Sequence, residues 1–188
     1  MSIGLIIAIA VVVLLAVAAG LTYNRMVARR NAVDSSWAQI DVQLRKRHDL
    51  IPPLVEAVKG YAAHERGTFE QVAESRGAAM AATRVADRAS AEGALGRATG
   101  ALLGVAEAYP ELEASTNFSK LQTQLREVED QIAIARRVYN DTVETYNTLV
   151  QVFPALIVAR LAGFNRREFF DTPTAAEATP AVDLSPSS

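Results

Sequence analysis

The most hydrophobic part of the chain is an uninterrupted apolar run, IGLIIAIAVVVLLAVAAGL, at residues 3–21. A helix of this length crosses the roughly 30 Å hydrocarbon core of a bilayer. A cleaved secretory signal is the alternative, because residues 16–18 read Ala-Val-Ala and resemble a cleavage site. Such a signal begins with positive charge, however, and only Met1 and Ser2 precede the run. The pattern therefore predicts an N-terminal transmembrane anchor at residues 1–22.

After the anchor, apolar residues recur alternately three and four positions apart, which is the spacing of a seven-residue coiled-coil repeat. Arg30 and Arg47 stand at two positions of this repeat. Because the repeat begins directly after the apolar run, we expect one rod from residue 3 to about residue 63, roughly 90 Å long at 1.5 Å per residue. The apolar positions of the repeat are Tyr23, Met26, Val33, Trp37, Ile40, Leu44, Ile51, Leu54, Val58 and Tyr61.

The rod is predicted to end at residues 64–68, where Gly67 can take the left-handed conformation that ends many helices. Thr68 with Gln71 has the form of a capping box that opens the next helix. The following segment, residues 69–108, is rich in Ala and in glycine, and each interior glycine costs about 1 kcal/mol relative to Ala. This segment is either a helix that a neighbour approaches closely or a helix that is locally broken. Its glycines include Gly93, Gly96, Gly100 and Gly104.

A second repeat with the same three-four alternation predicts another long helix in the second half of the chain. A turn at residues 109–111, Tyr-Pro-Glu, precedes it, and Pro154 ends or kinks it. Residues 155–161 predict a short apolar helix capped at Gly163. Residues 172–188 lack apolar periodicity and are predicted to be disordered. The positions of the second repeat are Phe118, Leu121, Leu125, Val128, Ile132, Ala135, Tyr139, Thr142, Tyr146, Leu149 and Phe153.

These patterns together predict an all-α fold, because no segment shows the alternation typical of a strand. The transmembrane helix continues into an antiparallel, coiled-coil-like bundle of long helices at residues 23–171. Arg25, Arg29 and Arg30 follow the anchor, and every Lys and Arg lies after it. The positive-inside rule assigns that side to the cytoplasm. We therefore expect a single-pass protein of the plasma (inner) membrane with a cytoplasmic bundle.

Composition narrows the chemistry that the chain can carry. It contains no cysteine, so disulfides, thiol catalysis and Cys-ligated metals are excluded. A net charge of −2 gives no general attraction for nucleic acid. His48 and His64 are its two histidines, and His64-Glu65 lacks the second His of the zinc-protease motif. We expect no catalytic residue, no cofactor and no metal site.

The stretch RKRHDLIPPLVE at residues 45–56 places two prolines inside the first repeat. Each interior proline costs about 3 kcal/mol, yet the three-four alternation passes through both, which a loop would not preserve. We interpret the stretch as a fixed bend in a helix that presents Arg47 and His48. Pro52 and Pro53 cannot donate hydrogen bonds, and the Asp49 side chain can act as a local cap by accepting from the amide of residue 51.

Two Tyr-Asn pairs, Tyr139-Asn140 and Tyr146-Asn147, lie one heptad apart in the second long helix. A tyrosine in such a repeat buries its ring and needs a partner for its hydroxyl. The pairs therefore indicate a specific polar register inside the bundle, with recognition of another molecule as the alternative. The arginines in the C-terminal half similarly indicate either solvated faces or contacts with anionic lipid or acidic partners.

Several longer blocks of sequence resemble the LemA family. They extend over residues 23–65 and 109–147 and include RHDLIPPLVE, ARRVYN, FPALIVA and a Gly-Phe near the end. The resemblance covers nearly all of residues 1–171. It implies a bacterial membrane-anchored helical bundle without an established enzymatic activity, similar to proteins implicated in shaping or organising membranes. It supplies no catalytic residue.

We expect a non-enzymatic membrane scaffold that self-associates through its helical repeats and takes part in membrane organisation or assembly. A membrane-tethered sensor or adaptor that binds a protein partner is the alternative. The bilayer and further copies of the chain are the expected partners, and nucleic acid is not one. The residues expected to carry interactions or to shape the helices are Trp37, Arg47, His48, Asp49, Pro52, Pro53, Tyr139, Asn140, Tyr146 and Asn147.

Overall fold

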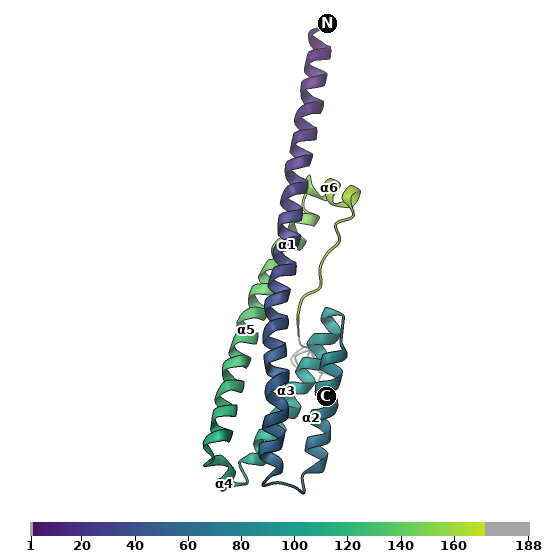
Figure 1. The fold of residues 1–188 in the computed structure, drawn as a ribbon. Helices are drawn as coiled ribbons and strands as arrows, with labels where there is room; N and C mark the ends of the chain where they lie inside the picture. The colour runs from purple at the N-terminus through teal and green to yellow at the C-terminus, as the bar shows by residue number, and fades with distance from the viewer. Residues whose placement is uncertain (1, 172–188) are drawn as a thin grey trace, which may run out of the picture.

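The computed structural model describes residues 2–171, and these form helices without strands. The long helices run alternately down and up the molecule, joined by short turns (Figure 1). This confirms the predicted all-α antiparallel bundle. The tail predicted to be disordered, residues 172–188, lies outside the described residues. The helices are α1 (Ile3–Lys59), α2 (Arg66–Ala81), α3 (Val85–Ala106), α4 (Pro110–Glu113), α5 (Thr116–Gln151) and α6 (Ala155–Ala162).

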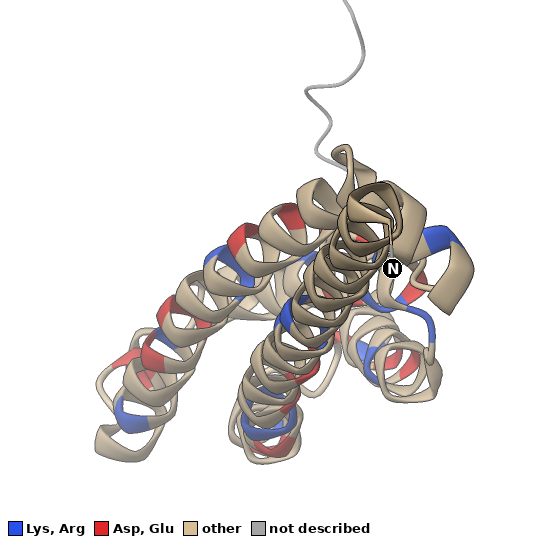
Figure 2. Ribbon diagram, turned by 90° about the horizontal axis from the view of Figure 1, so that it is seen from above, with Lys and Arg blue, Asp and Glu red and all other residues tan. Residues whose placement is uncertain are grey.

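Helix α1 is a single rod of 57 residues, about 85 Å long at 1.5 Å per residue. Its first part stands clear of the other helices, and its remainder packs along the antiparallel α5 (Figure 1). Seen from above, the free part carries no charged residue (Figure 2). Among the described residues, α1 is the one helix long and apolar enough to cross a membrane. The predicted rod is therefore present, and it ends four residues earlier than expected.

The first repeat describes the core face of α1 well. The buried apolar residues of this helix are Met26, Val33, Ile40, Leu44, Ile51, Leu54 and Val58. At the two ends of the repeat, Tyr23 and Tyr61 are about half exposed. Arg47 is buried with the apolar residues, so a charge lies inside the bundle.

The second repeat is correct as far as Tyr139 and then drifts. Val143 and Val150 are buried in place of Thr142 and Leu149, and Phe153 is 80% exposed. An α-helix has 3.6 residues per turn, so a strict seven-residue pattern rotates by about 20° per heptad relative to it. Over the 36 residues of α5, this rotation moves the core face by one position.

The predicted turn after α1 is wrong in its details. Gly67 lies inside α2 and does not adopt a left-handed conformation, and no side chain caps the start of α2. The turn is closed by backbone bonds instead, from the Tyr61 amide to the Val58 carbonyl (3.0 Å) and from the Glu65 amide to the Ala62 carbonyl (3.0 Å). These bonds satisfy groups at the helix end, so a left-handed glycine is not required.

Residues 69–108 are broken into α2 and α3, which pack against each other as a hairpin. The break lies at residues 82–84, where Ala82 and Arg84 are extended, and it precedes the glycine-rich part. The segment is therefore broken, but the break does not lie at the glycines that the sequence suggested as its cause. The glycines 93, 96, 100 and 104 all lie within α3.

Helix α1 continues through Pro52 and Pro53, both of which are exposed. The carbonyl of His48, which loses its helical donor to Pro52, accepts a hydrogen bond from Arg76 Nε of α2 at 2.9 Å. Two expectations for this stretch are wrong. Arg47 and His48 are each 4% exposed and are not presented at the surface. The Asp49 side chain caps nothing among the described residues, because the helix is unbroken and the amide that follows stays within it.

The C-terminal part of the chain returns along the bundle. Helix α6 ends at Gly163, which has φ 73° and so takes the left-handed conformation predicted for it. Residues 164–171, here called the C-terminal segment, then run without helix from α6 toward α3 (Figure 1) and are hydrogen-bonded to α5. The segment places Phe164 and Phe170 in the core.

Replacing the prolines of α1 tests whether the continuous helix is under local strain. We expect Pro53→Ala to stabilise the full-length protein by up to about 3 kcal/mol, since it restores a helical hydrogen bond and removes a clash. Pro52→Ala should stabilise less, because the His48 carbonyl already has Arg76 as a donor. Thermal unfolding in mild detergent measures both. Equal gains would contradict a structural role for the Arg76 bond.

Candidate functional site

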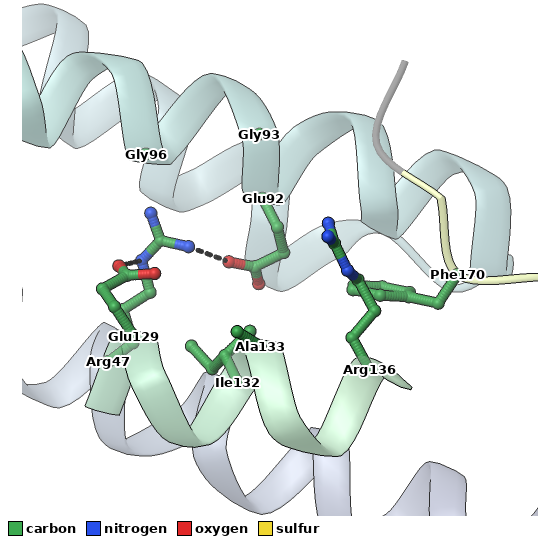
Figure 3. A pocket seen from close by; sticks show the side chains of 9 residues that line it. All are labelled: Arg47, Glu92, Gly93, Gly96, Glu129, Ile132, Ala133, Arg136 and Phe170. Atoms are coloured by element: carbon green, nitrogen blue, oxygen red, sulfur yellow. Dashed lines mark hydrogen bonds and ion pairs between the residues drawn. The ribbon is translucent and has the colours of Figure 1, made fainter. Parts of the chain in front are cut away.

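The first cluster of interest is a buried ion-pair network that joins α1, α3 and α5. Arg47 Nη1 of α1 lies 3.3 Å from Glu92 Oε2 of α3, and Arg47 Nε lies 2.9 Å from Glu129 Oε1 of α5. Arg47 and Glu92 are buried, whereas Glu129 is partly exposed. Each long helix of the bundle core thus contributes one charge to the same level (Figure 3).

His48, the neighbour of Arg47, binds the other oxygen of the same carboxylate. Its Nε2 lies 2.7 Å from Glu92 Oε1, and the ring is buried. With a proton on Nε2, the imidazole donates to the carboxylate. Both oxygens of Glu92 therefore have partners on α1, which compensates the cost of burying a carboxylate.

This polar layer divides the core into two hydrophobic clusters. Above it, Leu44 and Ile132 belong to the cluster that includes the C-terminal segment. Below it, Ile51 and Leu125 belong to the cluster around α2, α3 and α4. Sliding α3 along α1 by one turn would leave Arg47 and Glu92 buried without each other, which is strongly unfavourable. The layer therefore fixes the register of the helices.

Glu129 completes the network from the more exposed side. Burial raises the pKa of its carboxyl above the usual value, and the repulsion from Glu92 adds to this, while the attraction of Arg47 acts in the opposite direction. The net direction is upward, so partial removal from water outweighs the ion pair. Glu129 thus balances the charge of Arg47 at some cost in its own hydration.

A cavity of about 220 Å³ lies beside the network, between α3 and α5. Figure 3 shows Arg47, Glu92 and Glu129 on its wall. Gly96 faces Arg47 closely: a Cβ at this position would lie 3.0 Å from Arg47 Nη2. The absence of a side chain therefore makes room for the guanidinium. The cavity is lined by Arg47, Glu92, Gly93, Gly96, Glu129, Ile132, Ala133, Arg136 and Phe170.

The arrangement is suited to holding helices together. The Arg47 and Glu92 charges offset each other, and the Nε2 atom of His48 is occupied by Glu92. Within residues 2–171, no group of three His, Cys, Asp or Glu residues is placed to hold a metal ion.

The second cluster is a ladder of hydrogen bonds between α5 and the C-terminal segment. Asn147 Oδ1 accepts from the Arg167 amide (2.8 Å), and Asn147 Nδ2 donates to the Arg167 carbonyl (2.9 Å). Asn140 repeats this with Phe170, at 2.9 Å from the amide and 3.4 Å to the carbonyl. Each asparagine therefore binds one residue of the segment as a neighbouring β-strand would.

The two tyrosines of the repeated pairs extend the ladder. Tyr146 Oη donates to the Asn165 carbonyl and Tyr139 Oη to the Glu168 carbonyl, each at 2.9 Å. Burial is the largest reason that the pKa of each hydroxyl lies above its usual value. Both tyrosines thus keep the proton that they donate.

The spacing of the ladder explains why the Tyr-Asn pair is repeated after seven residues. Seven residues of α-helix rise about 10.5 Å. Three residues of extended chain span about 10 Å. The partners of Asn147 and Asn140 are three residues apart, as are the partners of the two tyrosines. The helical repeat and the extended segment are therefore in register.

Trp37 of α1 contacts both the ladder helix α5 and the C-terminal segment. Its ring lies 5.4 Å from the ring of Tyr139 and 5.6 Å from that of Phe170, both at tilted or edge-on angles. Such aromatic pairs are favourable beyond the area that they bury. The C-terminal segment is therefore held between polar groups of α5 and an aromatic ring of α1.

The structure divides the predicted interaction residues into three sets. Arg47 and His48 meet in the polar layer, whereas Asp49, Pro52 and Pro53 are exposed and belong to neither cluster. The remaining predicted residues all contact the C-terminal segment, and they are Trp37, Tyr139, Asn140, Tyr146 and Asn147.

Sequence reasoning missed Glu92, Glu129 and the C-terminal segment. Glu92 had a detectable signal, because it lies three residues from Ala89 and three from Leu95, which are both buried. An acid in the apolar repeat of one helix is a candidate partner for Arg47 in the repeat of another. The segment gave no signal, since an extended chain without a partner strand has no period of its own.

Comparison with known proteins identifies related sequences. The model of the LemA family matches residues 36–184. The chain is similar to Magnetosome protein MamQ 2 of Paramagnetospirillum magneticum, at 26% identity with 85% of this chain and 68% of the relative covered. It is also similar to Magnetosome protein MamQ of Magnetospirillum gryphiswaldense, at 25% identity with the same coverage. None of these names denotes an enzyme.

Removing one rung tests the ladder. Asn147→Ala leaves the amide and carbonyl of Arg167 without their partner, which costs about 1–3 kcal/mol for buried groups. We expect faster hydrogen exchange at the Arg167 amide and throughout residues 164–171. Asn165→Ala is the control, because Asn165 is exposed and its side chain makes a single local bond of 3.5 Å. Unchanged exchange in Asn147→Ala would show that this rung does not hold the segment in place.

Two glycines of α3 test the packing of Arg47. A Cβ added at Gly100 would meet no atom within 4 Å, so Gly100→Ala should stabilise the helix by about 1 kcal/mol. Gly96→Ala should gain less or lose stability, because its Cβ meets a guanidinium held by two carboxylates. Denaturant unfolding in mild detergent compares them. An equal gain for both variants would mean that Arg47 moves freely.

Proposed function

The chain belongs to the LemA family, and from this premise we propose that it is a non-enzymatic, membrane-anchored helical scaffold that self-associates and organises or assembles structures at the membrane. The family name and the names of the two relatives support a role other than catalysis. In this proposal the helical bundle acts by binding other molecules through its surface.

The observation that carries the proposal is the continuity of α1. One helix includes the apolar residues 3–21 and then supplies the core of the bundle down to Val58. A rotation or tilt of the anchor is therefore transmitted directly to the bundle, as expected of a protein that holds material at a fixed geometry to a membrane. Arg25, Arg29 and Arg30 support a cytoplasmic bundle at the inner membrane.

A surface for self-association lies on the side of the α1–α5 pair away from α3. A groove of about 430 Å³ is formed there, with Val42, Ile134 and Val138 exposed at its edges. None of its lining residues is charged, although 21% of the chain is. The groove is lined by Ser35, Ala38, Gln39, Val42, Gln43, Gln131, Ile134, Ala135 and Val138.

A second copy of the chain is the occupant that fits this surface. An uncharged face meets its own copy without repulsion, and its glutamine amides both donate and accept, so it is self-complementary about a two-fold axis. Anchoring two copies in one bilayer raises their effective concentration, which favours a contact of modest size. The exposed side chains of Val42, Ile134 and Val138 supply the apolar part of this contact.

Charge placed in the groove tests the proposal. We expect the wild-type protein to contain more than one copy per particle in lipid nanodiscs or mild detergent, measured by light scattering. Val42→Glu with Ile134→Glu should reduce it to one copy, because two like charges would then face each other across the two-fold axis. Met80→Glu, at an exposed apolar residue of α2, is the matched control.

A wild-type protein that is strictly monomeric at native density would overturn the self-association. Crosslinking that instead recovers one stoichiometric heterologous partner would favour the adaptor function. An assembly that is unchanged by both groove substitutions would place the contact elsewhere on the chain.

A further inference from the structure

Helix α6 lies beside α1 just where the apolar run ends. The ring of Phe164, which follows α6 after one glycine, lies 5.5 Å from the ring of Tyr23 and 5.3 Å from the guanidinium of Arg30. Tyr23 is two residues beyond the apolar run, a rise of about 3 Å. Figure 1 shows α6 extending sideways next to α1, at the lower end of its free part.

If residues 3–21 cross the hydrocarbon core, α6 lies at the depth of the lipid headgroups. The headgroup region adds about 5–8 Å on each side of a core of about 30 Å. Tyr23 lies within that distance of the end of the span, and α6 packs beside it. The position of α6 is therefore set by contacts that are independent of its own exposed side chains.

The exposed side of α6 is unusually apolar for a helix in water. Its packed face is formed by Ala155 and Ala159, which are buried against the bundle. The larger residues point elsewhere: Ile157 is 52% exposed and Leu161 is 85% exposed. Phe153, four residues before Ile157, is 80% exposed. The spacing of four puts Ile157 and Leu161 on one side of α6, and Phe153 is exposed in the turn directly before the helix.

Several basic residues lie at about the same level as this apolar side. Arg160 and Arg166 are exposed at and after α6, and Arg25 and Arg29 are exposed on the adjoining part of α1. An apolar stripe bordered by arginine is the pattern of a helix that lies in the interface of an anionic bilayer. A long arginine side chain can reach lipid phosphate while its neighbours lie among the acyl chains.

We propose that α6, with Phe153, is a second membrane contact that lies in the headgroup region of the leaflet from which α1 emerges. The occupant of its apolar side is the lipid surface, with Phe153, Ile157 and Leu161 inserted at the acyl boundary. This inference rests on the proposed anchor. Its consequence is that the rod is attached at two points, so its tilt and height relative to the membrane are fixed.

Depth measurements with single cysteines test the proposal, because the chain has no natural cysteine. Leu161→Cys reports on α6, Leu15→Cys on the anchor, and Ser119→Cys on the far end of α5. Each full-length variant is labelled with an environment-sensitive fluorophore and reconstituted in vesicles of phosphatidylglycerol and phosphatidylcholine. Lipids carrying a quencher near the headgroup or deep in the acyl chain then measure depth.

We expect the label at Leu161→Cys to emit at shorter wavelength than that at Ser119→Cys and to lose most of its emission to the shallow quencher. The label at Leu15→Cys should be quenched best by the deep lipid. No quenching at Leu161→Cys, with quenching retained at Leu15→Cys, would overturn the α6 contact and leave the anchor standing. No quenching at either position would overturn the anchor as well.

A second variant separates lipid from protein as the occupant. Ile157→Glu, placed in the Phe153→Cys background, should shift the label at position 153 to longer wavelength and reduce its shallow quenching, because a carboxylate is expelled from the interface. Met80→Glu in the same background should change neither. A shorter-wavelength emission that lipid quenchers leave untouched would mean that a second copy covers α6, and would overturn the proposal.

Discussion

A guanidinium buried in the middle of the bundle is the constraint on which the arrangement of the helices depends. Arg47 lies in the apolar repeat of α1 and is 4% exposed there, so most of its hydration is lost. Its charge is balanced by Glu92 of α3 and Glu129 of α5, so three helices must meet at one height. Purely apolar faces tolerate sliding, because one Leu-Ala contact resembles the next. Losing a partner of a buried charge costs several kcal/mol, so the layer selects one register.

Once this register is set, the positions of the other parts follow. The upper cluster places Trp37 and Tyr139 so that an aromatic slot remains for Phe170. The lower cluster packs the α2–α3 hairpin against the end of α1. Because α1 also contains the apolar residues 3–21, the same helix joins the polar layer to the proposed membrane anchor. The proposed scaffold role, the groove for a second copy and the lipid contact of α6 all depend on this shared axis.

The sequence predicted those features that depend on local periodicity. The buried face of α1, the continuity of that helix through residues 52 and 53 and the cap at Gly163 were predicted, because each is decided within a few residues. The turn after α1 was predicted wrongly, since Gly67 only permits a left-handed cap and backbone bonds closed the turn before it. The drift of α5 escaped because a seven-residue pattern is an approximation to the helix. The partners of Arg47 could not be predicted from the sequence, because this requires knowing which helices become neighbours.

The ladder between α5 and the C-terminal segment depends on two spacings at once: seven residues along the helix and three along the extended segment. Both asparagines reach their partners only if neither spacing changes. Losing one residue of α5 between Asn140 and Asn147 would turn one amide by about 100° away from the segment. Adding a whole heptad with a third Tyr-Asn pair would instead accommodate three further residues of extended chain. Length changes in this part of α5 are therefore tolerated only in steps of seven, matched by steps of three in the segment.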